Sequence, residues 1–84
     1  MNQIAMVEWT DSYSAFGWQG TDSLDGIRIT KIISIGIIKF REEDVVVIPT
    51  QSITNGDIHS PIAIPKGSIT KISYLKVEDV PANT

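Results

Sequence analysis

Residues 27–40 read IRITKIISIGIIKF, and isoleucine occupies seven of these fourteen positions. Because β-branched side chains favour strands, the segment predicts a β-strand from Ile27 to Phe40. A strand longer than the usual length of about five or six residues has to bend within a small domain. We expect the bend at Gly36, where no side chain opposes a close backbone approach.

The two faces of this strand are apolar over different parts of its length. The odd-numbered face carries five isoleucines between residues 27 and 37, whereas the even-numbered face becomes apolar only at Ile32, Ile38 and Phe40. This pattern predicts a bent strand that presents opposite sides to the core at its two ends. Exposure of the odd-numbered face at a subunit contact is the alternative.

The rest of the chain has the same preference for strands. Ile, Val and Thr make up 28 of the 84 residues, whereas Leu and Ala together supply six, so the composition predicts an all-β domain. In the first segment, Ala5, Val7 and Trp9 share one face, and we expect Trp9 to point inward. Five strands are predicted: Gln3–Trp9, Ile27–Phe40, Val45–Ile48, Ile62–Ile64 and Ile69–Val77.

Turn residues define the connections between these strands. Residues 10–25 mix Asp, Ser, Gly and Thr with aromatic residues, which is typical of a long ordered loop. The charged run 41–44 predicts a tight hairpin with a solvated tip, and Asn55-Gly56 predicts a turn in the polar segment 51–61. One short helical turn is expected at Lys66–Ser68, before the last strand.

Length and charge exclude several classes of protein. Eighty-four residues allow one small domain, which we place at residues 1–77, followed by a flexible tail at 78–84. A net charge of −3 argues against generic nucleic-acid binding. No long apolar segment or secretory signal is present, so we expect no membrane association. The absence of cysteine fits a reducing, cytoplasmic location.

The sequence contains few groups that could carry out catalysis. His59 is the only histidine, it has no metal-ligand spacing around it, and we expect it in an exposed loop. No phosphate-binding glycine motif or nucleophile elbow is present. The sequence therefore predicts a protein without enzymatic activity, cofactor or metal. Four acidic residues, Glu8, Asp11, Asp22 and Asp25, lack the spacing of a calcium loop and are expected to cap turns and solvate the first loop.

Aromatic residues are concentrated near the first loop. Four of the six lie between residues 9 and 18, where they either close one end of the domain as a lid or bind a ligand. Residues 1–26 carry a charge of −4 and residues 27–84 a charge of +1. An anionic ligand would therefore need basic residues from the later strands or from a neighbouring subunit. The residues expected to bind a ligand are Tyr13, Phe16, Trp18, Arg28, Lys31, Lys66 and Lys71.

Self-association is expected from the predicted sheet edges. Ile62–Ile64 carries no charge that would discourage pairing with another strand. Edge-to-edge contact between copies would satisfy the exposed backbone groups, so the sequence predicts a homo-oligomer.

The order of these segments resembles that of the Src-homology-type (SH3-like) and Sm-like small barrels. Residues 64–69 (IPKGSI) resemble the turn that joins their last two strands, and SIGI at 34–37 with EDV at 43–45 resembles their central hairpin. The resemblance implies a five-stranded small β-barrel. It does not extend to the binding of proline-rich peptides, because valines occupy positions 45–47, where such domains begin their third strand with tryptophan.

A second resemblance is to a group of small, mostly uncharacterised phage-borne proteins. It is carried by EWTDS at 8–12, Gly17-Trp18, SIG at 34–36 and IPK at 64–66. It implies an anti-defence protein in the cytoplasm of a bacterial host that sequesters a small nucleotide signal. The alternative is an interaction adaptor that binds a host or phage protein through the aromatic loop or an open sheet edge. A structural component of the virion is a third hypothesis.

Overall fold

The computed structural model describes residues 3–12 and 29–82 of the chain. A single turn of 3-10 helix separates the last two strands. The elements are β1 (Gln3–Ser12), β2 (Ile29–Phe40), β3 (Asp44–Ile48), β4 (Thr50–Gln51), β5 (Ile58–His59), β6 (Ile62–Pro65), η2 (Lys66–Ser68) and β7 (Ile69–Leu75). The all-β prediction is confirmed, as is the helical turn before the last strand.

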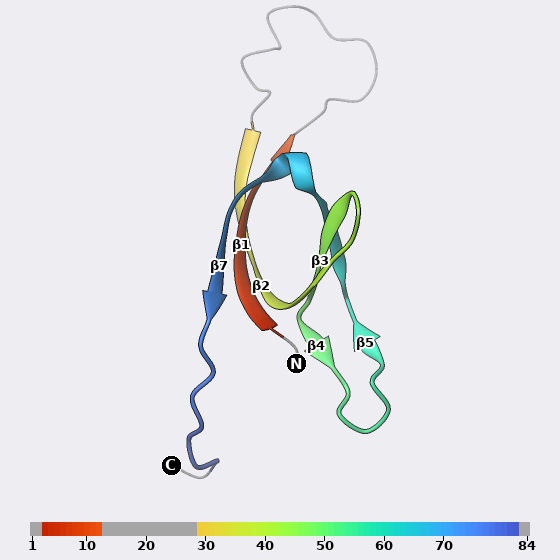
Figure 1. The fold of residues 1–84 in the computed structure, drawn as a ribbon, viewed down its shortest axis with the longest axis vertical. Helices are drawn as coiled ribbons and strands as arrows, with labels where there is room; N and C mark the ends of the chain where they lie inside the picture. Colours follow the sequence, from red (N-terminus) through yellow and green to blue (C-terminus); the bar gives the residue numbers. More distant parts are fainter. Residues whose placement is uncertain (1–2, 13–28, 83–84) are drawn as a thin grey trace, which may run out of the picture.

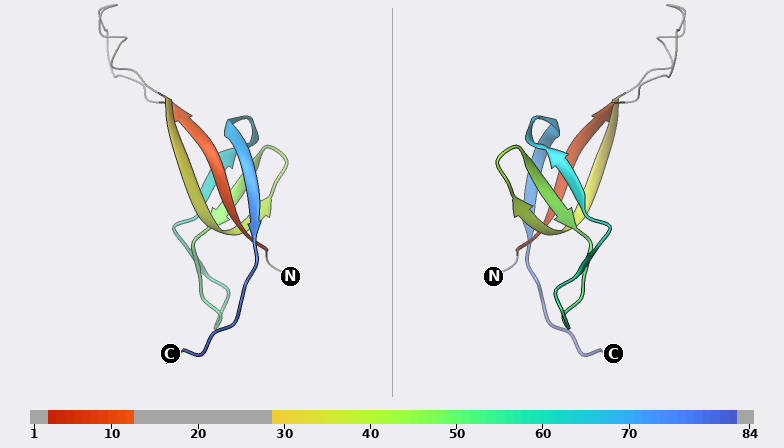
Figure 2. Two further views of the ribbon diagram at one scale, coloured as in Figure 1. Left: turned by 90° about the vertical axis from the view of Figure 1, so that its left-hand side faces the viewer. Right: turned by 90° about the vertical axis from the view of Figure 1, so that its right-hand side faces the viewer.

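Five of the strands form one antiparallel sheet in the order β6-β3-β2-β1-β7. The sheet is strongly curved, so that η2 connects one edge strand, β6, to the other, β7 (Figure 1). Figure 2 shows the same curvature from both sides. The hydrogen-bonded pairs describe an open sheet with β6 and β7 as its edges.

Two predicted strand ends are wrong by two or more residues, and pairing explains both of them; β3 begins and β6 ends within one residue of the prediction. β1 continues to Ser12 because its last three residues pair with the first three of β2. β7 ends at Leu75, two residues before the predicted end, because its pairing with β1 stops at Ile4. The polar segment 51–61 is not a plain loop, since β4 and β5 pair across the predicted turn, with Gly56 at a φ of 80°.

Pairing with β1 also determines which side of β2 faces the interior. Trp9, which is inward as predicted, pairs with Ile32, so the even-numbered residues of β2 point inward as far as Ile38, which is buried. The expectation that β2 presents opposite sides to the core at its two ends is wrong. On the odd-numbered face, Ile29, Ile33 and Ile35 are 72%, 59% and 53% exposed.

Gly36 lies where β2 curves most closely against β3. A Cβ atom at this position would lie 2.8 Å from the carbonyl carbon of Ile48, and closer still to its oxygen. Only glycine allows the two backbones to approach in this way. The predicted bend of β2 is visible as its curve at the lower end of the sheet (Figure 1).

The interior of the curved sheet is small and apolar. Trp9 contributes its largest side chain, and the indole Nε1 donates a hydrogen bond of 3.0 Å to Ser34 Oγ. Among the described residues, no polar or charged residue is buried. The buried residues are Ala5, Val7, Trp9, Ile38, Val45, Val47, Ile48 and Ile64.

The β4–β5 hairpin and the C-terminal tail lie at the end of the molecule opposite η2 (Figure 1). In the part of the chain that the structure describes, no helix has the length and apolarity needed to cross a membrane.

Candidate functional site

The end of the sheet nearest η2 is where β1 ends and β2 begins. Ser12 pairs with Ile29 there, and Thr10 Oγ1 donates a hydrogen bond of 3.4 Å to the carbonyl oxygen of Ser68 in η2. The segment between these two strand ends carries three of the six aromatic residues of the chain. Four predicted ligand-binding residues, Tyr13, Phe16, Trp18 and Arg28, lie outside the described residues.

A β-bulge interrupts the β1–β7 pairing close to this end. Glu8 pairs with Lys71 and Trp9 pairs with Ile69, so that Thr70 is an extra residue on β7. The Thr70 hydroxyl donates a hydrogen bond of 3.0 Å to the carbonyl oxygen of Glu8. Bulges commonly re-aim side chains beside binding sites, and this one lies next to a surface hollow.

The hollow has a volume of about 380 Å³, and the residues that line it include two outward-facing pairs of β1 and β2, Glu8 with Ile33 and Thr10 with Lys31. Its rim combines one ammonium group, one carboxylate and two hydroxyl groups with an apolar wall. Volumes of roughly 300–1,000 Å³ are typical of small-molecule sites. The residues that line it are Glu8, Trp9, Thr10, Lys31, Ile32, Ile33 and Thr70. We call it the Lys31 hollow.

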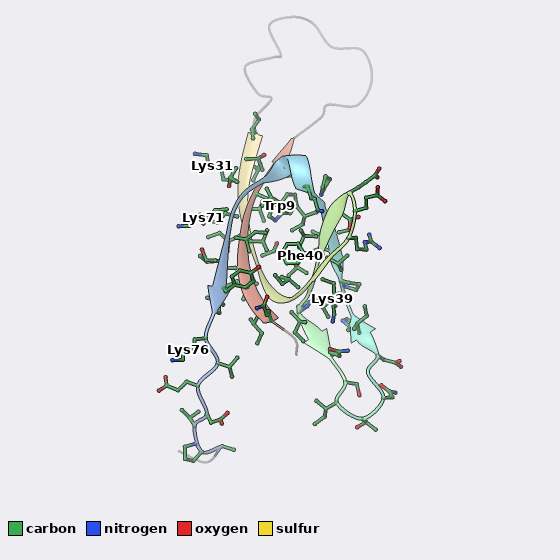
Figure 3. The ribbon with its side chains drawn as sticks, viewed as in Figure 1. Trp9, Lys31, Lys39, Phe40, Lys71 and Lys76 are labelled. Carbon is green, nitrogen blue, oxygen red and sulfur yellow. The ribbon has the colours of Figure 1, made fainter. Side chains whose placement is uncertain are left out.

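Two of the predicted basic residues lie on this outer face. Lys71 is opposite Glu8 on β7, and Lys31 is diagonal to Glu8 on β2. Figure 3 shows Lys31 and Lys71 projecting on the same side of the molecule, away from the inward Trp9. Both lysines could therefore contact one anionic ligand.

Lys66 belongs to a different part of the surface. Its backbone N–H donates a hydrogen bond of 3.0 Å to the carbonyl oxygen of Glu43, beside the β2–β3 turn. Lys76, which the sequence analysis did not single out, projects on the same side as Lys31 and Lys71 (Figure 3). It follows the end of β7, so strand alternation gave no signal for its position.

A second hollow of about 360 Å³ lies between the end of β1 and η2. It shares Trp9 and Thr10 with the Lys31 hollow, so the two adjoin the same part of β1. The residues that line it are Trp9, Thr10, Asp11, Ile29, Pro65 and Ser68. It offers a carboxylate and two hydroxyl groups but no basic side chain, and therefore suits an anion less well.

The charged turn between β2 and β3 has the solvated hairpin form that the sequence predicts. The Arg41 N–H donates a hydrogen bond of 2.9 Å to the Asp44 carbonyl oxygen. Arg41 Nε and Nη2 also donate to the two carboxylate oxygens of Asp44, each at 2.6 Å. These side-chain hydrogen bonds, more than the charge of Arg41, hold the pKa of Asp44 below its ordinary value of 3.8.

The titratable residues that the sequence analysis considered for metal or acid–base chemistry lie in strands where the structure describes them. No cluster of three or more potential metal-binding side chains occurs in residues 3–12 or 29–82. His59 is exposed, as predicted, but it lies in β5 rather than in a loop; its Nδ1 is 2.8 Å from Ser60 Oγ. Glu8 and Asp11 lie within β1, so the expectation that they cap turns is wrong for both.

Comparison with protein-family models, with curated proteins and with solved structures finds no match to this chain.

Proposed function

We propose that this chain is a non-enzymatic binding protein that captures a small anionic ligand and acts as a homo-oligomer. The observation that carries this proposal is the Lys31 hollow, where an ammonium group, hydroxyl oxygens and an apolar wall meet beside the Glu8 carboxylate. Lys71, opposite Glu8, adds a second ammonium group close by. Lysine binds phosphate groups through charge-assisted hydrogen bonds. The apolar wall suits a planar ring.

The fold proposed for this protein is a small barrel of the Src-homology or Sm-like type. Three features support it: the strong curvature of the five-stranded sheet, the order of its elements, and the single helical turn that connects its two edge strands. A barrel of this size has little interior volume, so a ligand would bind on its surface.

The ligand that combines phosphates with planar rings is a nucleotide. The resemblance to small phage-borne proteins further implies that this nucleotide is an immune signal of the bacterial host, which the protein sequesters as an anti-defence device. Sequestration requires tight binding and no chemical reaction.

Thermal unfolding in the presence of nucleotides tests the proposed function. A ligand at about 100 times its dissociation constant stabilises the native state by about 2.7 kcal/mol, which raises the melting temperature of a domain of this size by about 10 °C or more. We expect one or more cyclic dinucleotides or related signals to produce such a shift. The absence of a shift for every nucleotide at saturating concentration would argue against nucleotide capture.

Lysine variants connect this shift to the Lys31 hollow. Lys31→Ala combined with Lys71→Ala removes both ammonium groups from the outer face, and we expect the nucleotide-induced shift to be lost. Lys39→Ala is the matched control, because Lys39 projects from a different part of the molecule (Figure 3). If the nucleotide raised the melting temperature equally in the wild type, the double variant and Lys39→Ala, the ligand would bind outside the Lys31 hollow.

A second candidate function is that of an interaction adaptor for a host or phage protein. It is favoured by the two edge strands, β6 and β7, each of which pairs on one side only among the described strands. An extended segment of another protein could add to either edge. Stoichiometric capture of one host protein, lost on Trp18→Ala, together with no response to nucleotides, would favour this alternative.

A further inference from the structure

The outer face of β7, β1 and β2 carries a continuous group of apolar side chains, which we call the outer patch. Cross-strand pairing sets its rows. Leu75, Ile4 and Ile37 form one row, and Met6 and Ile35 lie side by side in the next. Ile33 follows Ile35 along β2 and also lines the Lys31 hollow. The outer patch therefore ends where the candidate ligand site begins.

The described elements leave this face uncovered. Ile33, Ile35 and Leu75 are 59%, 53% and 41% exposed, although they lie on a three-stranded part of the sheet. Among the described residues, eight apolar side chains are buried and eleven large ones are exposed. A sheet that is apolar on both faces normally packs a second layer against each of them.

The apolar part of this face has the size of an interface centre, not of a whole interface. Six apolar positions, on strands about 4.8 Å apart and in rows about 6.7 Å apart, give roughly 190 Å² of apolar surface. A stable interface buries about 800 Å² on each partner, with an apolar centre and a polar rim. The outer patch supplies such a centre, and the polar row beside it supplies a rim.

The charges beside the outer patch indicate which partner would fit. Glu8 lies between Lys71 and Lys31, and none of the three forms an ion pair with another described residue. A face that carries unpaired charges of both signs offers complementary partners to a second copy of itself. A partner with only one sign of charge would leave the other sign unmatched.

We propose that the outer patch packs against the same face of a second copy of this chain, and that the second copy closes over the Lys31 hollow. This contact is distinct from pairing at the sheet edges, which β6 and β7 leave available. The contact between copies does not depend on the proposed function. Only the placement of the ligand between two copies rests on it. Because Ile33 belongs to both the outer patch and the hollow, assembly and ligand capture are coupled.

A charge placed in the centre of the outer patch tests the proposal. Ile35→Glu would bury a carboxylate between two copies, and Ile35→Thr keeps the β-branched shape while adding a hydroxyl group. Ile53→Glu is the matched control, because Ile53 is an isoleucine that is fully exposed in the β4–β5 hairpin. The assembly mass is measured by sedimentation equilibrium without ligand, and circular dichroism verifies that each variant is folded.

We expect Ile35→Glu to halve the mass of the wild-type assembly, or to raise its dissociation constant by at least about tenfold. Ile35→Thr should raise the dissociation constant by less, and Ile53→Glu should leave it unchanged. A wild-type protein that is monomeric throughout, or a folded Ile35→Glu variant with the wild-type mass, would overturn the proposal. In that case the face is covered by the protein's own chain or remains exposed.

The mass is measured without ligand, so the failures of the two proposals are distinguishable. An assembly that depends on Ile35 but binds no nucleotide would overturn the proposed function alone. A nucleotide response with no change of mass in Ile35→Glu would overturn the interface alone.

Discussion

Ser34 is a polar residue on the inward face of β2, and it made that face difficult to identify from the sequence. It lies at an inward position of β2, opposite Val7, where alternation would call for an apolar residue. Its hydroxyl oxygen accepts the hydrogen bond from Trp9 Nε1, so the indole N–H has a partner inside the sheet. With Gly36 as the next inward residue, the even-numbered face appeared polar, and the prediction for β2 failed there.

Replacing Ser34 tests this explanation. Ser34→Ala leaves the Trp9 N–H without a partner in a largely buried position, and we expect the free energy of unfolding to fall by about 1–3 kcal/mol. The measurement is urea denaturation followed by circular dichroism. Trp9→Phe removes the hydrogen-bond donor, so Ser34→Ala in that background should lower the free energy of unfolding by less. Equal costs in both backgrounds would show that the hydrogen bond contributes nothing.

A second residue-scale prediction concerns Gly36. A methyl group there would overlap the Ile48 carbonyl group, which belongs to the backbone of β3 and cannot move alone. We expect Gly36→Ala to destabilise the protein by about 2 kcal/mol or more. Gly67→Ala is the control, because a Cβ atom at Gly67 has no atom within 4 Å, and it should be nearly neutral. Similar unfolding midpoints for the two variants would contradict the close approach of β2 and β3.

The Arg41–Asp44 pair predicts a pH dependence confined to acid conditions. The pKa of Asp44 in the folded state is below its ordinary value of 3.8, so the ion pair stabilises the fold above that pH. This contribution is lost as the pH falls through the folded pKa. A carboxyl titration by NMR should give Asp44 a pKa below 3.8 in the wild type, and a value closer to 3.8 in Arg41→Gln. An unchanged pKa in Arg41→Gln would exclude the ion pair as the cause.

At the scale of the elements, β6 is an edge strand held to the interior by one residue. Ile64 is completely buried opposite Val45, whereas Ile62 in the same strand is 38% exposed. Ile64→Ala should therefore cost about 2–5 kcal/mol, and Ile62→Ala clearly less. Chemical denaturation of the two variants compares the same substitution at two depths of one strand. Equal losses would mean that β6 is not anchored through Ile64.

Local residue preference predicted the elements better than it predicted their limits. The hairpin at 41–44, the turn at Asn55-Gly56 and the helical turn at Lys66–Ser68 follow from local chemistry, and all three occur. The ends of β1 and β7 depend on how far a partner strand extends, which no local pattern contains. The same limit applies to β4 and β5, two short strands that pair only with each other.

The candidate site was predicted only in part, for the same reason. Lys31 and Lys71 are 40 residues apart in the chain, and only the pairing of β2 and β7 with β1 brings them to one face. The bulge beside Thr70 and the hollow lined by Glu8 had no signal in the sequence. Lys66 was grouped with the other lysines by charge alone, and the topology places it by the β2–β3 turn instead.

At the scale of the whole molecule, the exposed apolar side chains are what the proposed self-association would cover. Eight buried side chains form a thin core, while the outer patch, the sheet edges and the tail residues Val77 and Val80 remain exposed. Association would cover part of this surface and enclose the Lys31 hollow, which links the assembly to ligand capture.

Co-sedimentation of a cyclic dinucleotide with the wild-type protein, followed at the absorbance of the nucleobases, tests nucleotide capture by an assembled protein most directly. We expect the nucleotide to sediment with a species of at least twice the 9.2 kDa chain mass. A nucleotide that remains free at saturating protein concentration, or one that sediments with a 9.2 kDa monomer, would contradict capture between copies.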